Sequence, residues 1–329
     1  MGIVDDKGPA VTTAAQALYE AAHQALAAPS IFNSQPWRWV VLPDALQLWA
    51  DRSRQLASVD PQGRLLTLSC GAAAHHAMAA VAGHPAELTL SPDADEPDLM
   101  AVLRLREGEP PLTRRNDLRP AISLRRTDRR AFQKTPIGGK ILDRLVAACH
   151  EHGAHLYLVP GHQMPALALA AVSAGALQLS DPAYRMELAD WTHRPPWSGD
   201  GVPLQTAVKS GPRRVPVRDF APFGGATMPP GLDNDFGATY AAIYTDADCP
   251  ADWLAAGAAL SAVLLTATAF GLATATISDV TEAPVVREQL RQLLPTGYPQ
   301  IALRIGHPQA GDPPSTPRRP AEEVITVAA

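Results

Sequence analysis

The sequence predicts an α+β fold in which two similar halves are joined in one chain, with antiparallel-rich mixed sheets flanked by helices. Segments of helical and strand-like pattern alternate along the chain. One pattern also occurs twice: an alanine-rich helix begins near Gly-Ala-Ala, ends in glycine and leads into a strand, at residues 71–90 and again at 257–278. A loop-rich stretch at about residues 181–237 interrupts the second half.

The first half, residues 1–112, is expected to contain two helices and four strands. Ala, Leu and Glu dominate its first helix, which Thr12 or Thr13 can cap and Pro29 ends. Pro43-Asp44 separates two apolar runs in the manner of a hairpin. The expected helices are 13–27 and 65–83, and the expected strands are 37–42, 46–50, 87–90 and 101–106.

The second half, residues 113–329, is expected to repeat this kind of arrangement with more helices. Residues 140–151 are amphipathic, whereas residues 254–272 are apolar throughout. The latter stretch is long enough to cross a membrane, but its small residues favour a buried core helix. The expected helices are 117–124, 140–151, 164–179, 251–270 and 285–294, and the expected strands are 155–159, 240–245, 273–278 and 301–305.

The interrupting stretch at about 181–237 is too long for an ordinary connection within a compact domain. Such insertions are most often functional lids or arms, and the alternative is a disordered surface insertion. Its aromatic residues favour a lid that packs onto the rest of the molecule. They are Trp191, Trp197, Phe220, Phe223 and Phe236.

The composition narrows the range of partners. The chain has 329 residues, 46% of them hydrophobic, and a net charge of −5. An acidic chain of this kind is not expected to bind nucleic acid, which requires a basic surface. Arginines nevertheless cluster at 114–130, 213–218 and 318–319. Such local positive charge predicts a small anionic ligand.

The cellular location follows from the N-terminal segment and the cysteines. The first residues lack the basic and apolar regions of a signal peptide. The three cysteines are far apart and odd in number, which favours reduced thiols over a disulfide framework. We therefore expect a cytoplasmic protein that is not inserted in a membrane.

Two short segments predict a binding site for a planar, phosphorylated ligand. In Pro29–Trp37, two prolines stiffen a turn that carries Asn33 and Gln35, whose amides suit the polar edge of a flat heterocycle. In Arg125–Phe132, four arginines surround Thr127, a pattern that suits a phosphate group. From charge alone, a solvated basic helix end would be the simpler reading of the second segment.

Other kinds of site find little support. The sequence contains no phosphate-binding loop of the G-x-x-x-x-G-K-[ST] type and no strand-linked G-x-G-x-x-G. His150, Glu151 and His152 adjoin but point to different helix faces, so no metal site is predicted. No nucleophile motif is present, and no catalytic residue is assigned.

The two motifs resemble those of the nitroreductase superfamily of flavin mononucleotide (FMN) proteins. Pro-Ser-x-x-Asn-x-Gln-Pro-Trp and Arg-Arg-Thr-x-Arg are similar to its ring-binding and phosphate-binding segments, and Pro317-Arg318-Arg319-Pro320 is similar to its C-terminal signature. With Asp51-Arg52-Ser53-Arg54 and Thr67–Gly71, the chain resembles the mycobacterial, dormancy-associated Acg-like branch. The resemblance extends over most of the chain.

The resemblance implies a role for each part of the candidate site. The arginine-rich segment would bind the phosphate and the pyrimidine edge, the Pro29 turn would contact the flavin ring, and the end of the strand at 273–278 would offer backbone N–H groups to flavin N5. The residues that the resemblance places in the FMN site are Arg125, Arg126, Thr127 and Arg129; Pro29, Ser30, Ile31 and Asn33; Thr276, Ile277, Ser278 and Asp279; and Arg318 or Arg319.

The sequence departs from the family in two respects. Where the family often has Pro-x-Glu-Gly, this chain has Thr276-Ile277-Ser278-Asp279, which affects hydride transfer more than flavin binding. Each motif also occurs once, although the family is ordinarily a homodimer with two sites. We therefore expect a monomer that mimics the dimer and keeps one FMN site under a lid.

Two functions remain open at this point. The first is an FMN-dependent oxidoreductase that acts on a small aromatic or quinone-like substrate. The alternative is a flavin storage or sequestration protein with little or no NAD(P)H-dependent turnover.

Overall fold

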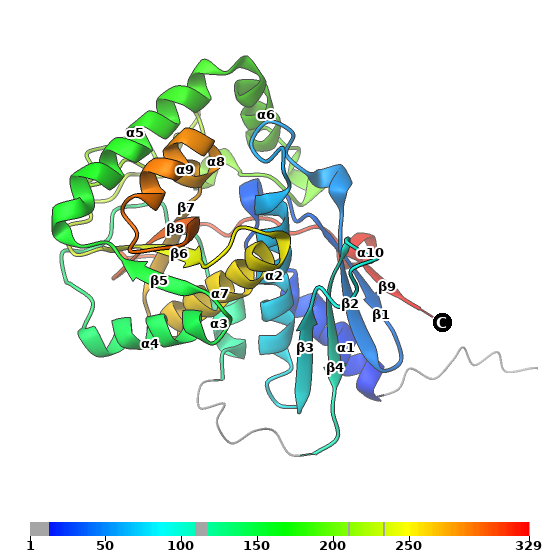
Figure 1. Ribbon diagram of the computed structural model, residues 1–329. Helices are drawn as coiled ribbons and strands as arrows, with labels where there is room; N and C mark the ends of the chain where they lie inside the picture. The colour runs from blue at the N-terminus through cyan, green and yellow to red at the C-terminus, as the bar shows by residue number, and fades with distance from the viewer. Residues whose placement is uncertain (1–12, 109–116, 210, 233, 329) are drawn as a thin grey trace, which may run out of the picture.

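Two long helices form the centre of the molecule. The computed structural model describes residues 13–108, 117–209, 211–232 and 234–328. Helices α2 (Arg64–Ala80) and α7 (Pro250–Ala269) pack side by side, and one β-sheet lies on each side of the pair (Figure 1). By length and composition α7 could cross a membrane, but most of its residues are buried here. It is the core helix that the sequence predicts.

The contact between α2 and α7 is reciprocal. A Cβ added at Gly71 would lie 2.0 Å from the carbonyl oxygen of Leu254, and one added at Gly257 would lie 2.0 Å from that of Leu68. Each helix therefore uses its glycine to approach the same position of the other helix. Such a contact is isologous, the type that relates two copies across a two-fold axis.

A hydrogen bond at the centre of this contact follows the same relation. The separation along the chain that relates Gly71 to Gly257 also relates His75 to Ser261. Nδ1 of His75 lies 2.7 Å from Oγ of Ser261. Equivalent residues that touch each other lie close to a local two-fold axis.

The two sheets have the same strand order. The first contains β3 (Ala86–Leu90), β4 (Leu99–Leu105), β2 (Ala45–Ala50) and β1 (Trp37–Val41), in that order. The second contains β7 (Ala273–Ile277), β8 (Tyr298–Gly306), β6 (Thr239–Thr245) and β5 (His155–Leu158). All these pairs are antiparallel.

The burial of side chains along a strand shows which of its faces is covered. Trp37, Trp39 and Val41 of β1 point inward and are buried, whereas Arg38 between them is exposed. Strand β8, by contrast, is buried at every position after Tyr298 because helices cover both of its faces (Figure 1).

The remaining helices pack around the sheets and the central helix pair. In the first half, α1 packs on β1, β2 and α2; in the second half, α4 packs on α7 and β5, while α5 covers α8 and α9. Their bounds are α1 (Thr13–Ala25), α3 (Arg119–Leu124), α4 (Gly139–His150), α5 (Met164–Ser180), α6 (Pro182–Thr192), α8 (Asp279–Glu282), α9 (Pro284–Arg291) and α10 (Ala321–Val324).

The structure differs from the sequence prediction in the C-terminal tail. Residues 325–327 form β9 (Ile325–Val327), which pairs in parallel with β1 and completes the first sheet. Polar and proline residues before it gave no strand signal, because pairing with an existing sheet edge decides its conformation. The second half thus contributes a strand to the sheet of the first. The expected division between residues 112 and 113 lies outside the described residues.

The 181–237 segment also differs from expectation, because it begins with helix α6. Trp191 on α6 is buried, as the prediction required, and Phe220 packs against Phe32. Trp197, Phe223 and Phe236 are instead exposed. Only part of the aromatic set therefore packs onto the rest of the molecule.

Candidate functional site

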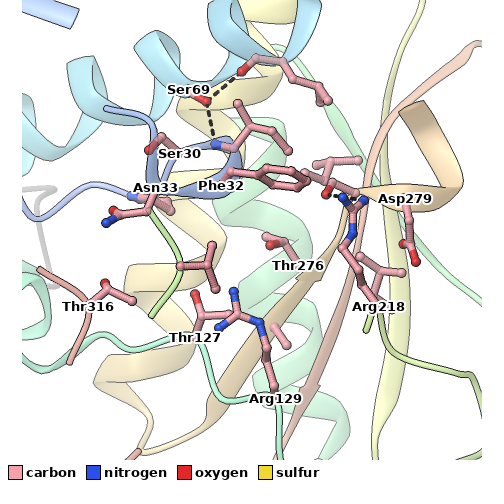
Figure 2. A pocket seen from close by; sticks show the side chains of 18 of the residues that line it. Ser30, Phe32, Asn33, Ser69, Thr127, Arg129, Arg218, Thr276, Asp279 and Thr316 are labelled. Atoms are coloured by element: carbon pink, nitrogen blue, oxygen red, sulfur yellow. Dashed lines mark hydrogen bonds between the residues drawn. The ribbon is translucent and has the colours of Figure 1, made fainter. Parts of the chain in front are cut away.

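A pocket lies beside the central helix pair and is lined by residues of both helices. It encloses about 1050 Å³, part of which is open to solvent. Figure 2 shows that its side chains come from the Pro29 turn, from α2, from the arginine-rich segment and from the end of β7. Leu65, Leu68, Leu260 and Ile301 give it an apolar floor. We call it the central pocket.

The central pocket brings together most of the residues that the sequence singled out. Arg126 and Arg319 do not line it: Arg126 donates hydrogen bonds to the carbonyls of Ser123 and Arg125, and Arg319 lies 3.7 Å from Glu323. The predicted residues that do line it are Pro29, Ser30, Ile31, Asn33, Arg125, Thr127, Arg129, Thr276, Ile277, Ser278, Asp279 and Arg318.

The Pro29 turn has an unusual backbone. Phe32, Asn33 and Gln35 have φ angles of 47°, 54° and 47°, in the left-handed region that non-glycine residues seldom adopt. The backbone N–H of Ile31 donates to Oγ of Ser69 on α2, at 3.1 Å, and this bond fastens the turn to the core. Strain of this type is maintained by surrounding structure and is concentrated at functional sites.

Asn33 and Gln35 join the turn to two other segments. Nδ2 of Asn33 donates to the carbonyls of Gly201 and Pro317, both at 3.1 Å. Nε2 of Gln35 donates to the carbonyl of Gly199 at 2.8 Å. The sequence suggested that both amides contact the edge of a ligand. In the structure the amide nitrogens of both side chains hold the 181–237 segment against the turn, that of Asn33 also holds the C-terminal tail, and Asn33 lines the central pocket as well.

Arg125 and Arg318 converge at one end of the central pocket, and Arg129 lines the pocket beside Phe220. Nη2 of Arg125 and Nη2 of Arg318 both donate to the carbonyl oxygen of Ala27, at 3.1 and 3.0 Å. Arg129 donates to the carbonyl of Thr206 and lies over the ring of Phe220. Among the described residues, no carboxylate forms an ion pair with any of the three arginines.

The electrostatics of this end call for an anion. Burial, reinforced by the charge of Arg318, lowers the pKa of Arg125 to about 9, and burial lowers the pKa of Arg129 and of Arg318 to about 10. Nε of Arg125 and Nε of Arg318 are buried without a hydrogen-bond partner. Buried cations and donors without partners are unfavourable, so this cluster is preorganised for a multiply charged, oxygen-rich group.

A buried ionic network fixes the arginine-rich segment. Arg304 on β8 forms an ion pair with Asp235 and donates to the carbonyls of Asp128 and Arg130, at 2.9 and 2.8 Å. The guanidinium of Arg130 in turn pairs with the carboxylate of Asp128. Two of the four arginines in the motif therefore face the pocket, and Arg130 maintains the shape of the segment.

The opposite end of the pocket is formed where β7 gives way to α8. Ile277 and Asp279 are buried there. Burial raises the pKa of Asp279 to about 6; the nearby carboxylate of Glu282 adds to this rise, and the cation of Arg218 opposes it. The structure thus places a carboxyl group that titrates near neutral pH in the pocket wall.

Arg218 and Phe220 complete the site from the 181–237 segment. Arg218 forms an ion pair with Glu282, and its guanidinium group also lies over the rings of Phe32 and Phe220. Its guanidinium carbon is 4.9 Å from the centre of the Phe32 ring. Burial opposes the charge of Arg218, but the combined attraction of Glu282, Tyr184 and Asp279 outweighs burial and raises the pKa of Arg218 above its ordinary value. The basic run at 213–218 was the sequence signal for this residue, but spacing alone could not connect it to α8.

No metal centre accompanies the pocket in the part of the chain that the structure describes. No group of three or more His, Cys, Asp or Glu side chains gathers there in a way that could hold a metal ion.

Comparison with known proteins places the chain in a family. No family model matches it. Over 98% of its length it is 37% identical to "Putative NAD(P)H nitroreductase Rv3131" of Mycobacterium tuberculosis, and the match covers 96% of that protein. It is 34% identical to "Putative NAD(P)H nitroreductase acg" of the same species, over 92% of this chain and 93% of that protein. The chain belongs to the nitroreductase superfamily, in its Acg-like branch. The sequence motifs predicted this membership.

Solved nitroreductase structures are more distant from this Acg-like protein. A nitroreductase with bound FMN from Desulfitobacterium hafniense is 15% identical, with a TM-score of 0.41, over 65% of this chain and 99% of that chain. A nitroreductase with bound FMN from Bacteroides fragilis is 16% identical, with a TM-score of 0.38, over 60% and 91% of the two chains.

Proposed function

We propose that this Acg-like protein is an FMN-binding flavoprotein of nitroreductase type, with one flavin in the central pocket. Arg125, Arg129 and Arg318 would bind the phosphate, with Thr127 as a further hydroxyl donor. The ring would lie between the Pro29 turn and the end of β7. The observation that carries this proposal is the set of three arginines that line the pocket, Arg125 buried and Arg129 and Arg318 half-buried, with no ion-paired carboxylate among the described residues.

The residues present fit a phosphate group well. Guanidinium groups bind phosphate through paired, charge-assisted hydrogen bonds, and the unused Nε atoms of Arg125 and Arg318 supply such donors. A dianion between the three arginines would also reverse the depression of their pKa values, because it favours their charged form. The apolar floor formed by Leu65, Leu68 and Leu260 suits a flat aromatic ring.

We further propose that the chain is a monomer that mimics a dimer, with one half before and one half after the segment at residues 109–116. The shared strand order of the two sheets and the reciprocal contact of Gly71 and Gly257 support this view. The Pro29 turn lies in one half and the arginine-rich segment in the other, and each occurs once. One chain should therefore bind one FMN.

The 181–237 segment is proposed to be a lid on the central pocket. Val202, Val217, Arg218 and Phe220 line the pocket from this segment. Two ion pairs hold this segment against the rest of the molecule. Asp200 pairs with Arg54, and Arg218 pairs with Glu282. We place the protein in the cytoplasm, in agreement with its free cysteines.

Two modes of action are compatible with a covered flavin. The bound FMN would supply hydride chemistry, while the protein binds it, orients it and excludes water. An oxidoreductase of this type would use NAD(P)H and a small aromatic or quinone-like acceptor. A storage protein would bind FMN without turnover; the packing of Phe220 on Phe32 across the pocket, with ring centres 5.6 Å apart, favours this second mode.

Absorbance spectroscopy separates these proposals. After incubation with FMN and desalting, the protein should retain about one flavin per chain and elute at the mass of a monomer. Retention of no flavin would contradict the binding proposal, and retention of two per chain would contradict the single site. Addition of NADPH or NADH then tests turnover: rapid loss of the flavin band indicates an oxidoreductase, whereas reduction by dithionite alone indicates storage.

A further inference from the structure

Asp279 is the one residue with a carboxyl group among the described residues that line the central pocket. It follows β7 by two residues and is 4% exposed, and Figure 2 shows it beside Arg218 at the end of that strand. The cation of Arg218 forms its ion pair with Glu282 rather than with Asp279. Within the described ranges, Asp279 is therefore a buried acid beside the pocket without an ion pair of its own.

The hydrogen bonding of this carboxyl group leaves one of its oxygens available for a proton. The backbone N–H of Val280 donates to Oδ1 of Asp279 at 3.1 Å. Burial raises the pKa of Asp279 to about 6 against the opposing cation of Arg218, and the carboxylate of Glu282 adds to the rise. The carboxyl group can therefore gain or lose a proton at Oδ2 near neutral pH while it keeps its bond to Val280.

The surroundings of Asp279 do not fix it in the charged form. Arg218 and Arg304 are each engaged in an ion pair, with Glu282 and Asp235. Helix α5 packs on α8 but has no charged residue, and the charged residues of α9 have ion-pair partners of their own. The charged or titratable groups that act on Asp279 or share a cavity wall with it are Arg218 and Asp219 of the 181–237 segment, Glu282 of α8, Tyr184 of α6 and Arg304 of β8.

The proposed position of the flavin ring links this carboxyl group to electron transfer. The ring would lie between the Pro29 turn and the end of β7, and Asp279 lines the pocket at that end. Two electrons added to a ring in this pocket bring negative charge close to the carboxylate. A like charge nearby disfavours the ionised carboxylate, and a buried site screens this repulsion less than water does. Reduction should therefore draw a proton onto Asp279.

We propose that Oδ2 of Asp279 takes up a proton from solvent when the flavin in the central pocket is reduced, and releases it when the flavin is reoxidised. This inference rests on the proposed function and deepens it, because it assigns a chemical role to one residue of the pocket wall. The electrons come from the donor, either NAD(P)H or an electrode, and the proton comes from water. On Asp279 only an O–H bond forms or breaks. The inference holds for an oxidoreductase and for a storage protein alike.

Asp279→Asn provides a direct test, because asparagine has nearly the same shape and cannot take up the proton. Asp219→Asn is the matched control: Asp219 is exposed, and it lines the cavity behind Arg218 but not the central pocket. FMN retention is measured first for the wild type and both variants. Spectroelectrochemical titration of the FMN-loaded proteins then gives the midpoint potential of the bound flavin at pH 5 and at pH 8.

The expected result is a pH-dependent difference in potential. At pH 5 the carboxyl group is mostly protonated in both redox states, whereas at pH 8 its charge opposes reduction in the wild type alone. The potential of the wild type should therefore fall further between pH 5 and pH 8 than that of Asp279→Asn. The extra fall should be about 30 mV or more, which is a tenfold change in the equilibrium constant of a two-electron reduction.

Asp219→Asn should follow the wild type at both pH values. A difference between Asp279→Asn and the wild type that is the same at pH 5 and pH 8 would overturn the proposal, as would an equal change in Asp219→Asn. In both cases FMN retention would still support the flavin site. A wild type that retains no FMN would instead refute the proposed function itself.

A second measurement needs no variant, and it decides the question if Asp279→Asn fails to fold or to retain FMN. The infrared difference spectrum between the reduced and oxidised forms of the FMN-loaded wild type is recorded at pH 7. Reduction should produce the carbonyl stretch of a protonated carboxyl group, and this band should shift when the side-chain carboxyl carbon of aspartate is labelled with carbon-13. A spectrum without such a band would show that no aspartate gains a proton, and would overturn the proposal.

Discussion

Single side chains set the charge balance of the central pocket. Arg125 and Arg318 place positive charge at one end, Arg129 adds positive charge beside Phe220, and Asp279 adds a carboxyl group with a raised pKa where β7 ends. Arg126 and Arg319, each next in sequence to one of these arginines, lie outside the pocket. The sequence therefore identified the basic cluster, but the direction of each side chain depends on the local backbone.

Replacement of Arg125 should separate ligand binding from stability. Arg125→Met removes a buried cation, and the carbonyl of Ala27 keeps its hydrogen bond from Arg318. The unfolding midpoint of the FMN-free protein should stay the same or rise, whereas FMN affinity should fall about 10- to 100-fold, as expected for the loss of charge-assisted hydrogen bonds. Thermal unfolding and FMN titration measure these effects. Arg126→Met is the control, and an equal loss of affinity in it would contradict the assignment.

The raised pKa of Asp279 predicts a pH dependence of stability. Well below pH 3.8, the ordinary pKa of an aspartate, the carboxyl is neutral in both the folded and the unfolded state, so it contributes nothing. As the pH rises from about 4 to 6, the unfolded state loses this proton first, and the folded protein is progressively destabilised. Asp279→Asn should remove this penalty.

The free energy of unfolding of Asp279→Asn should therefore exceed that of the wild type by an amount that grows between pH 4 and pH 7, by up to about 3 kcal/mol. Urea unfolding of the FMN-free proteins at both pH values measures the difference. A difference that is the same at pH 4 and pH 7 would show that Asp279 is ionised as readily in the folded state as in the unfolded state.

At the scale of elements, the sequence predicted helices and strands well where the pattern of apolar residues is strong. Nearly every expected helix and strand of the two sheets is present, with ends shifted by a few residues. It missed α6, α8, α10 and β9, which are short or begin at proline-rich segments. Their conformation depends on contacts with distant parts of the chain, such as the pairing of β9 with β1.

The glycines of the central helices should be intolerant of substitution. A methyl group at Gly257 would overlap the carbonyl oxygen of Leu68, so α2 and α7 must separate to accept Gly257→Ala. We expect a loss of about 2 kcal/mol or more in the free energy of unfolding. Gly175→Ala, on α5, should instead gain about 0.5–1 kcal/mol because alanine favours the helix. Chemical denaturation compares the two; equal effects would contradict the close helix contact.

The whole molecule is closed by its C-terminal segment, which carries Arg318 to the central pocket and then adds β9 to the first sheet. Figure 1 shows the C-terminal strand β9, in red, beside the blue strand β1 from the early part of the chain. A chain with this path connects the second half, the pocket and the first sheet. The pocket and the fold should therefore depend on the same segment.

Removal of the residues after Arg319 tests this dependence. The truncation deletes the buried side chains of Val324 and Ile325 and leaves the edge of β1 unpaired. The free energy of unfolding should fall by about 3–5 kcal/mol, and the exposed edge should promote self-association in light scattering. Val327→Thr, at an exposed position of the same strand, should change stability by less than about 0.5 kcal/mol. An unchanged truncated protein would show that β9 is dispensable.

The sequence by itself determined the α+β class, the family, the two motifs and the single copy of each, because these depend on residue type and spacing along the chain. Only the tertiary structure decided which arginines face the pocket, that Asn33 and Gln35 hold distant segments, and that Arg218 and Phe220 complete the site. These depend on side-chain directions and on contacts between residues far apart in sequence, and local pattern carries no record of them.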